Sequence, residues 1–490
     1  DFVLTAGNFD CDTYNLDVND SVSISGTFDF GSGTVEIGGD FTANAGTLIE
    51  GTGTLIMNDV STLNIGTNKL YNFEFAGLSG DILTSTGTIV IENDYDISGG
   101  SGMSGGLFQV KGNVNVTDAT MSYSSSWKLE FIGSGTQTVN VVTLGELGPL
   151  KFSHSGTVDF QTDLNVTNSL SGGKMIEYVS GVVDWSGIEV NFVGRSLANS
   201  IIESGSMEYG DVKFSALSGG DMQLADNMVV GGDLNIFSIV DITGNKIQVK
   251  GSITSTDTSL SNDTTIIEWI GTGSKVLTQT GGGLLPGASF IINGTGTLTL
   301  TTNYAPNTAP SQSILLQQGI LDLSGFDLPI DNNFTVSNGA TIRLTGEETV
   351  TAGGLISFPA NWTADFYDVS ANANMSALGV DYNNIIFTGL KTHTFDNTAT
   401  YTSDGTISFS GTGLAIWVSD SPTNQYNFNY TGASSLGDKY DITDCDASGG
   451  NEIFAIGSTD GGNNDNIRFV ELISGFFNNI FNQEFNREFN

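Results

Sequence analysis

The sequence predicts an all-β fold, an elongated β-solenoid in the form of a parallel β-helix. Three observations lead to this prediction. Short runs alternate apolar and polar residues with a period of two, as in Thr34–Ile37 and Thr297–Leu300, which indicates strands with one buried face. Gly accounts for 64 of the 490 residues and interrupts these runs, which indicates turns. Sustained helical periodicity is absent before the end of the chain, so the body is predicted to contain no helices.

A loose internal repeat favours a stack of coils over a closed propeller. Related segments are Tyr71–Gly77, Pro149–Gly156, Gly210–Ser215, Ser289–Gly294 and Asn384–Gly389. Several copies are followed by an Asp-Leu-x-Val element, which begins at Asp163 and at Asp233 and has a variant at Asp94. The modules have irregular lengths of 60 to 95 residues. Such irregularity suits a solenoid with coil insertions, whereas propeller blades need a near-constant length.

This pattern predicts three regions. Residues 1–440 form the solenoid body with its irregular modules, residues 441–469 form closing coils, and residues 470–490 form a short C-terminal aromatic tail. The tail contains Phe476, Phe477, Phe481, Phe485 and Phe489. A four-residue spacing places side chains on one face of a helix. Two roles remain open for the tail: it caps its own last coil, or it connects to a neighbouring subunit.

The charge balance excludes several classes of function. The chain has 15 basic and 54 acidic residues, for a net charge of −39. A nucleic-acid-binding protein needs a basic face, so this class is excluded, and an anionic membrane surface is disfavoured as a partner. The sequence contains no apolar run long enough to predict a membrane span. The chain starts at Asp1, and we interpret it as a secreted protein whose signal peptide has been removed.

Two cysteines, Cys11 and Cys445, lie near opposite ends of the predicted rod. A disulfide needs Cα atoms within about 7 Å, so a bridge within one elongated chain is not expected. Head-to-tail stacking would bring Cys11 of one copy near Cys445 of the next, and this pair is the candidate for an intermolecular disulfide. The alternative is two free, buried thiols.

Calcium is the metal for which the sequence offers a candidate site. Asp460, Asn463, Asn464 and Asp465 supply oxygen atoms at high density in one Gly-rich stretch, and calcium takes six to eight oxygen ligands. The stretch does not match a complete calcium-loop spacing, so solvated turn residues are the competing interpretation. No cofactor is required. With 54 acidic residues, clusters of carboxylates arise by chance, and we expect no enzymatic activity.

Three stretches resemble a known class of proteins. They are GSGTQTVN (133–140), GTVDFQTDLNVTNSLSGG (156–173) and ITGNKIQVKGSIT (242–254). They are similar to the Gly/Thr/Asn-rich β-solenoid surface proteins of bacteria, archaea and phages, of the filamentous-adhesin type. Residues 440–469 resemble the segment that closes such arrays. The resemblance covers most of residues 20–469 and implies an extracellular or cell-surface location with a structural or adhesive role. It supplies no catalytic residues.

The leading functional hypothesis is a structural surface protein that assembles head to tail with itself into an extracellular filament or sheath. The open ends of a β-stack favour such a contact. The first alternative is an adhesin or carbohydrate-binding spike that contacts surface glycans. The second alternative is a polysaccharide-active β-helix enzyme.

Overall fold

The computed structural model describes most of the chain. The described residues are 1–78, 80–99, 102–118, 122–123, 127–142, 145–168, 173–194, 200–216, 221–237, 242–257, 265–308, 311–344, 348, 350–353, 356–357, 363–366, 372–375, 384–388, 391–395, 397–398, 400–403, 407–410, 414–421, 423–432 and 440–470. All statements about side chains below concern these residues.

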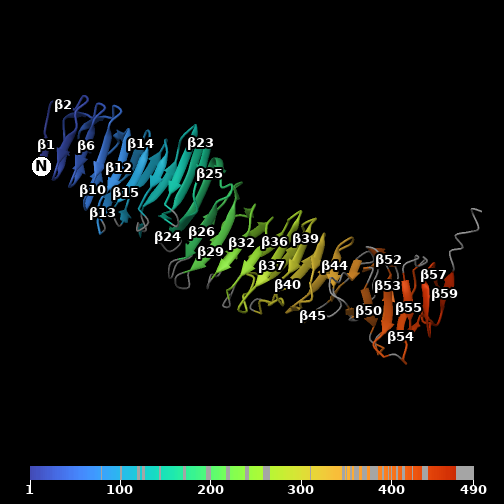
Figure 1. Ribbon diagram of the computed structural model, residues 1–490. Helices are drawn as coiled ribbons and strands as arrows, with labels where there is room; N and C mark the ends of the chain where they lie inside the picture. Colours follow the sequence, from blue (N-terminus) through green and yellow to red (C-terminus); the bar gives the residue numbers. More distant parts are fainter. Residues whose placement is uncertain are drawn as a thin grey trace, which may run out of the picture. The chain divides into compact units, whose positions relative to one another are not determined.

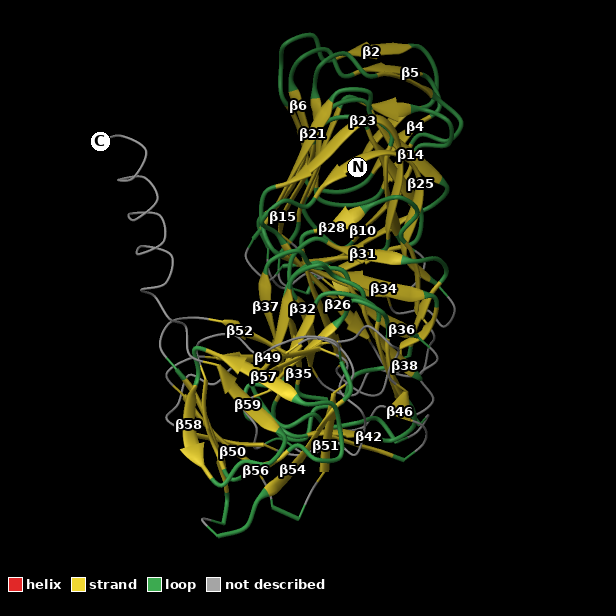
Figure 2. Cartoon of the chain, turned by 90° about the vertical axis from the view of Figure 1, so that its right-hand side faces the viewer, coloured by secondary structure: helices red, strands yellow, loops and turns green. Residues whose placement is uncertain are grey.

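The fold is a parallel β-solenoid of about 17 turns, and its described elements are all strands (Figure 1; Figure 2). The prediction of an all-β solenoid and of a parallel β-helix is therefore confirmed. The chain divides into two compact units. Unit 1 comprises Asp1–Ile270, Thr278–Phe290 and Pro306–Gln312, and unit 2 comprises Gly271–Leu277, Ile291–Ala305 and Ser313–Asn490. We describe each unit separately.

In the first turns of unit 1, each coil contributes one strand to each of three faces. The first face contains β1 (Phe2–Leu4), β4 (Val22–Ile24), β7 (Phe41–Thr42), β10 (Ser61–Asn64), β13 (Ile82–Ser85), β16 (Gly102–Ser104) and β19 (Ser122–Tyr123). The second face begins with β2 (Asn8–Asp10), β5 (Thr27–Asp29) and β8 (Thr47–Ile49) and includes β11 (Lys69–Leu70), β14 (Thr88–Ile91), β17 (Leu107–Val110) and β20 (Lys128–Phe131). The third face contains β3 (Leu16–Val18), β6 (Thr34–Ile37), β9 (Thr54–Met57), β12 (Asn72–Ala76), β15 (Tyr95–Gly99), β18 (Val114–Val116) and β21 (Thr136–Val141).

Two strands of 11 residues, β23 (Leu150–Phe160) and β25 (Lys174–Asp184), continue both the second and the third face. The other strands of unit 1 are β22 (Glu146–Leu147), β24 (Leu164–Asn168), β26 (Glu189–Gly194), β27 (Ser200–Glu203), β28 (Glu208–Tyr209), β29 (Asp211–Ala216), β30 (Met222–Leu224), β31 (Met228–Val230), β32 (Leu234–Phe237), β33 (Ile242–Gly244), β34 (Lys246–Val249), β35 (Ile253–Ser255) and β36 (Ile266–Trp269). Residues of both units occur in β37 (Ser274–Gln279) and β38 (Ser289–Ile292).

The strands of unit 2 are also stacked in parallel. Its strands are β39 (Thr297–Leu300), β40 (Ser313–Leu316), β41 (Ile320–Asp322), β42 (Leu328–Ile330), β43 (Phe334–Val336), β44 (Thr341–Leu344), β45 (Val350–Ala352), β46 (Ile356–Ser357), β47 (Thr363–Phe366), β48 (Asn372–Met375), β49 (Asn384–Thr388), β50 (Lys391–Phe395), β51 (Thr400–Ser403), β52 (Ile407–Ser410), β53 (Ala415–Ser419), β54 (Tyr426–Tyr430), β55 (Tyr440–Thr443), β56 (Cys445–Asp446), β57 (Ile453–Ile456), β58 (Thr459–Gly462) and β59 (Ile467–Val470).

The core is a set of inward columns, because alternate residues of each strand point inside. Aromatic side chains stack in register from one turn to the next. Phe131 and Phe152 are cross-strand partners, and their ring centroids lie 5.4 Å apart at 7°. Both are fully buried. Stacked aromatic pairs of this kind stabilise a core beyond the area they bury.

The Asp-Leu-x-Val element marks the corner before a strand. The aspartates at these corners accept a hydrogen bond from a backbone N–H of the next turn. Asp163 accepts from Glu189 at 2.7 Å, and Asp233 accepts from Ser252 at 2.7 Å. The corner aspartate therefore supplies an acceptor to an amide that the parallel ladder leaves unpaired, which explains why this residue recurs in the repeat.

One corner column requires a backbone with positive φ. Asp12, Gly31 and Gly51 have φ values of 52°, 59° and 52°. A Cβ atom at Gly31 would lie 1.8 Å from the carbonyl oxygen of Asp12. Only glycine fits a position that combines this backbone with so close an approach.

Candidate functional site

The structure places the sequence-predicted site residues in different parts of the chain. The tail residues Phe476, Phe477, Phe481, Phe485 and Phe489 lie outside the described residues, so their predicted role stays a prediction. The two cysteines and the predicted calcium residues are described. Cys11 follows β2 in the first turn, and Cys445 begins β56 near the end of unit 2.

Both cysteines are free thiols inside the core. Cys11 is 5% exposed and Cys445 is 0% exposed. Burial, followed by the nearby charges of Asp10 and Asp29, raises the pKa of the Cys11 thiol to about 11. Burial raises the pKa of the Cys445 thiol to about 12. A protonated, buried thiol reacts slowly, and the intermolecular disulfide stays a prediction.

Asp460 lies within β58 and the other three predicted calcium residues lie in the loop that follows, where all four take part in hydrogen bonds. Asn464 donates its amide N–H to Asp460 Oδ1 at 2.8 Å, and Asn463 donates to Asp444 Oδ1 at 2.7 Å. Gln425 donates to Asp465 Oδ2 at 3.0 Å. Within the described part of the chain, no group of three or more His, Cys, Asp or Glu side chains is arranged to hold a metal ion. Calcium at this loop stays a prediction.

The first turn presents an edge strand on each of the three faces. In the described residues, β1, β2 and β3 each have a neighbouring strand on one side only, namely β4, β5 and β6. Leu16 and Val18 of β3 point toward the core but are only partly covered, whereas their partners Val35 and Ile37 in the next turn are fully buried. The interior of the coil is therefore open at this turn.

The last described turn presents two edge strands. The strands β58 and β59 each end their sheet within the described residues, whereas the backbone of Asp465 pairs with the far side of β56 through hydrogen bonds to Cys445 and Ala447. Ile467 and Phe469 of β59 are partly exposed, but their partners Ile453 and Ala455 in β57 are fully buried. The last turn thus also leaves apolar side chains uncovered on one side.

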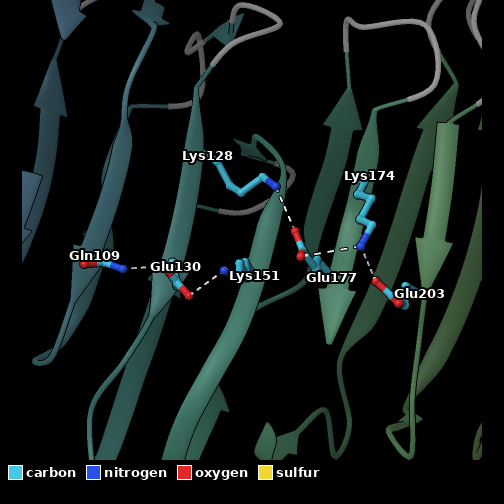
Figure 3. Close-up of polar contacts among 7 residues, drawn as sticks. All are labelled: Gln109, Lys128, Glu130, Lys151, Lys174, Glu177 and Glu203. Atoms are coloured by element: carbon cyan, nitrogen blue, oxygen red, sulfur yellow. Dashed lines mark hydrogen bonds and ion pairs between the residues drawn. The ribbon is translucent and has the colours of Figure 1, made fainter. Parts of the chain in front are cut away.

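A row of charged side chains, which we call the lysine ladder, follows the second face of unit 1. Its lysines are Lys69, Lys111, Lys128, Lys151 and Lys174, and its glutamates are Glu92, Glu130, Glu177 and Glu203. The central positions are cross-strand partners in successive turns, from Gln109 on β17 to Glu203 on β27. Figure 3 shows the lysines beside their glutamates: Lys151 contacts Glu130 of the neighbouring strand, Lys128 contacts Glu177 two strands away, and Lys174 contacts both Glu177 of its own strand and Glu203 of the next.

Glu130 is the most buried acid of this ladder, with a side chain only 4% exposed. Lys151 Nζ lies 2.9 Å from its Oε1, and Gln109 Nε2 lies 2.6 Å from its Oε2. Burial opposes ionisation of Glu130, but hydrogen bonds from Gln109, Ser153 and Lys151 outweigh it and hold its pKa below the ordinary value. The carboxylate is therefore charged at neutral pH and ties three successive turns together.

A second glutamate repeats this arrangement. Glu268 on β36 is a cross-strand partner of Gln248 on β34, and Gln248 Nε2 donates to it at 2.8 Å. Lys246 Nζ lies 2.9 Å from the same carboxylate, which is only 5% exposed. In this copy the lysine comes from the preceding turn, whereas Lys151 comes from the following turn. Sequence reasoning missed both glutamates, although Gln and Glu at outward positions one turn apart were a usable signal.

A shallow hollow lies on another part of unit 1. Its volume is about 440 Å³. It is lined by Val182–Gly187, Glu208–Asp211, Gly231 and Gly232. The glycines leave the backbone accessible, and Asp184, Glu208 and Asp211 bring carboxylates to the rim. Such a hollow can accept a small polar ligand.

These features define the class of protein: an all-β parallel solenoid with edge strands at the first and last described turns and a charged ladder along one face. No family model, no curated protein and no solved structure matches this chain. In the part of the chain that the structure describes, no helix is long and apolar enough to cross a membrane.

Proposed function

We propose that this chain is a secreted structural protein whose copies join head to tail in an extracellular filament or sheath. The observation that carries the proposal is the open coil at both ends of the described chain. The first turn has three edge strands and partly exposed core side chains, and the last described turn has two edge strands, β58 and β59, with partly exposed core side chains on β59. Edge strands template the addition of another chain, and a heterologous contact of this kind propagates if it does not close.

The proposed contact continues the β-ladder from one copy into the next. A turn stacked on β1, β2 and β3 would supply their missing hydrogen bonds and cover Leu16 and Val18. The same contact would cover Ile467 and Phe469 at the other end. Burial of apolar side chains together with backbone pairing is the combination that stabilises β-augmentation.

The aromatic tail is the proposed connector in this arrangement. Its five phenylalanines would be an aggregation hazard on a polar surface unless they are buried. Deleting residues 471–490 should abolish filaments seen by negative-stain electron microscopy. Filaments of unchanged length from the truncated chain would contradict this role for the tail and leave the edge contact to be tested separately.

The edge contact itself has a selective test at Val3. The N–H of Phe2 donates to Ser21 and the C=O of Leu4 accepts from Ser25, so these two residues bond toward the second turn. In a parallel strand the residue between them directs its N–H and C=O to the other side. The substitution Val3→Pro therefore removes the outward N–H and keeps the β1–β4 pairing. The matched control is Val3→Thr.

We expect Val3→Pro to shorten or abolish filaments while circular dichroism and thermal unfolding stay like those of the Val3→Thr control. Filaments from Val3→Pro that match the wild type in length and in critical concentration would count against axial growth through β1.

A second candidate function is carbohydrate adhesion, which the hollow of unit 1 favours. Carboxylates accept hydrogen bonds from sugar hydroxyls, and the exposed side chain of Val182 offers an apolar contact beside them. A glycan array with the wild type and with an Asp184→Asn/Asp211→Asn variant tests this function. Equal binding by both proteins, or no binding by either, would reject the hollow as a sugar site.

A further inference from the structure

The first turns of the solenoid carry only negative side chains. Residues 1–68 contain ten acidic residues and no lysine, arginine or histidine. Five of these acids fall within residues 1–20 and are exposed, namely Asp1, Asp10, Asp12, Asp17 and Asp20. The first lysine along the chain is Lys69, and its Nζ already contacts Glu92 Oε1 at 2.6 Å. The first turn therefore has a strong negative charge with no cationic side chain of its own.

The opposite end of the described chain is also acidic. Residues 440–470 contain six acidic residues and one basic residue, Arg468. Glu452 precedes β57, Asp460 lies in β58 and Asp465 follows β58, and all three are exposed. The Arg468 guanidinium lies over the ring of Phe454, 5.8 Å from its centroid. With one cation against six carboxylates, this end is negative as well.

The edge strands place these acids where the head-to-tail joint would form. Asp10 ends β2 and Asp17 is the middle residue of β3, and both strands have a neighbour on one side only among the described residues. Asp460 lies on β58, an edge strand of the last described turn. Neighbouring strands lie about 4.8 Å apart. A copy stacked on the first turn would therefore bring like charges close together.

Outward acids also lie next to each other inside the chain. Asp17 is the cross-strand partner of Glu36 on β6, and Glu74 on β12 is the cross-strand partner of Asp96 on β15. Like charges directly opposite each other on neighbouring strands are destabilising. A further acidic turn stacked on β3 would extend this repulsion across the joint.

We propose that the like charge of its two ends opposes the head-to-tail joint at low ionic strength, and that screening by salt permits the joint to form. This inference rests on the proposed function and adds a regulation of the same contact. Apolar burial and backbone pairing favour the joint. Salt weakens the repulsion between exposed charges at these ends. Dissolved ions therefore control the balance between single chains and filaments.

The test follows assembly of the full chain at several NaCl concentrations. Light scattering gives the critical concentration, electron microscopy identifies filaments, and circular dichroism checks the fold of each variant. The end variant Asp10→Asn/Asp17→Asn removes two charges from the first turn and keeps a side-chain oxygen at each position. The matched control Asp159→Asn/Asp163→Asn removes two charges from the body. Asp159 lies on β23, seven strands from β3 in the same sheet, which is roughly 34 Å at the usual strand spacing.

We expect the critical concentration of the wild type to fall about tenfold between about 10 and about 150 mM NaCl, because the Debye length falls from about 30 to about 8 Å. At about 10 mM NaCl, the end variant should assemble at a concentration about threefold lower than the wild type. The control should match the wild type. A second variant at the other end, Glu452→Gln/Asp460→Asn, should act like the first, because both ends meet in one joint.

Three outcomes would overturn the proposal. The first is a wild-type critical concentration that does not change with NaCl. The second is an equal effect of the end variant and of the control. The third is assembly that requires calcium at a fixed ionic strength and is reversed by a chelator, which would indicate a bound ion in place of screening. The absence of wild-type filaments at every salt concentration would instead reject the head-to-tail function itself, so the two failures are distinguishable.

Discussion

Lys151 Nζ lies 2.9 Å from Oε1 of Glu130, and the glutamate side chain is only 4% exposed while the lysine is 25% exposed. The pair is therefore formed by a buried carboxylate and a partly hydrated ammonium. Breaking such a pair leaves a buried charge with fewer partners, which costs more than the pair itself contributes.

The first prediction follows from this asymmetry. Replacing Lys151 with Met should lower the free energy of unfolding by about 2 kcal/mol, because Glu130 then keeps Gln109 but loses its counter-charge. Urea unfolding followed by fluorescence measures the change. The double variant Glu130→Gln/Lys151→Met should recover most of the loss. The control Lys69→Met removes a lysine that is 49% exposed and should have a much smaller effect. Equal losses in both lysine variants would contradict the role of burial.

The second prediction concerns acid. The pKa values of Glu92, Glu130 and Glu177 are lowered in the fold, because the opposing effect of burial is outweighed by lysine contacts at Glu92 and Glu177 and by hydrogen bonds from Gln109, Ser153 and Lys151 at Glu130. A lowered folded pKa contributes stability above the unfolded value of about 4.3, and this stability is lost as the pH falls through the folded value.

Thermal unfolding at a series of pH values from 7 to about 3 measures this contribution. The difference between the wild type and Lys151→Met should shrink as the pH falls below about 4.3, where Glu130 takes up a proton and no longer needs its counter-charge. A difference that stays constant down to the lowest pH would show that these carboxylates do not contribute through their charge.

The third prediction concerns the corner at Gly31. Its φ is 59°, and an added Cβ would lie 1.8 Å from the carbonyl oxygen of Asp12. Gly31→Ala should destabilise the first turns by about 3 kcal/mol or more, because backbone strain adds to a steric clash. Gly87 has a φ of 77° and open space around its Cβ position. The matched variant Gly87→Ala should therefore cost only about 1 kcal/mol. Equal costs would show that the close approach at Gly31 relaxes freely.

The fourth prediction concerns the thiols. Cys11 and Cys445 are buried, and burial raises the pKa of both thiols, to about 11 and about 12. In the native protein at pH 8, a thiol reagent should label neither residue within minutes, whereas the urea-unfolded chain should react at both. The predicted intermolecular disulfide is checked by non-reducing electrophoresis of assembled protein. If the protein runs as a monomer both with and without reductant, the predicted bridge is rejected.

The solenoid could be predicted from the sequence because its strands are short and regular. Thr34–Ile37 and Thr297–Leu300 alternate with period two and are strands of that length in the structure. The repeated segment around Phe75, Phe152 and Phe214 is a strand in each case. Local alternation and Gly-rich corners were sufficient to predict the strands and turns of the solenoid, since both signals extend over only a few residues.

The charged rows could not be predicted in the same way. Glu130 is the cross-strand partner of Lys151, and Glu74 is the cross-strand partner of Asp96. Both pairings depend on the length of the corners between strands. One added residue shifts the register and turns a side chain to the other face. The sequence shows these residues at outward positions but not which residue of the next turn lies beside them.

The sequence by itself therefore determined the all-β class, the coil repeat and the strongly acidic character of the chain, because these depend on composition and on contacts within a strand. Only the tertiary structure decided which side chains share a column, which glutamates are buried and which core residues lie uncovered at the first and last turns. The physical reason is that stacking brings together residues about 20 positions apart, and that pairing is set by the path of the whole coil.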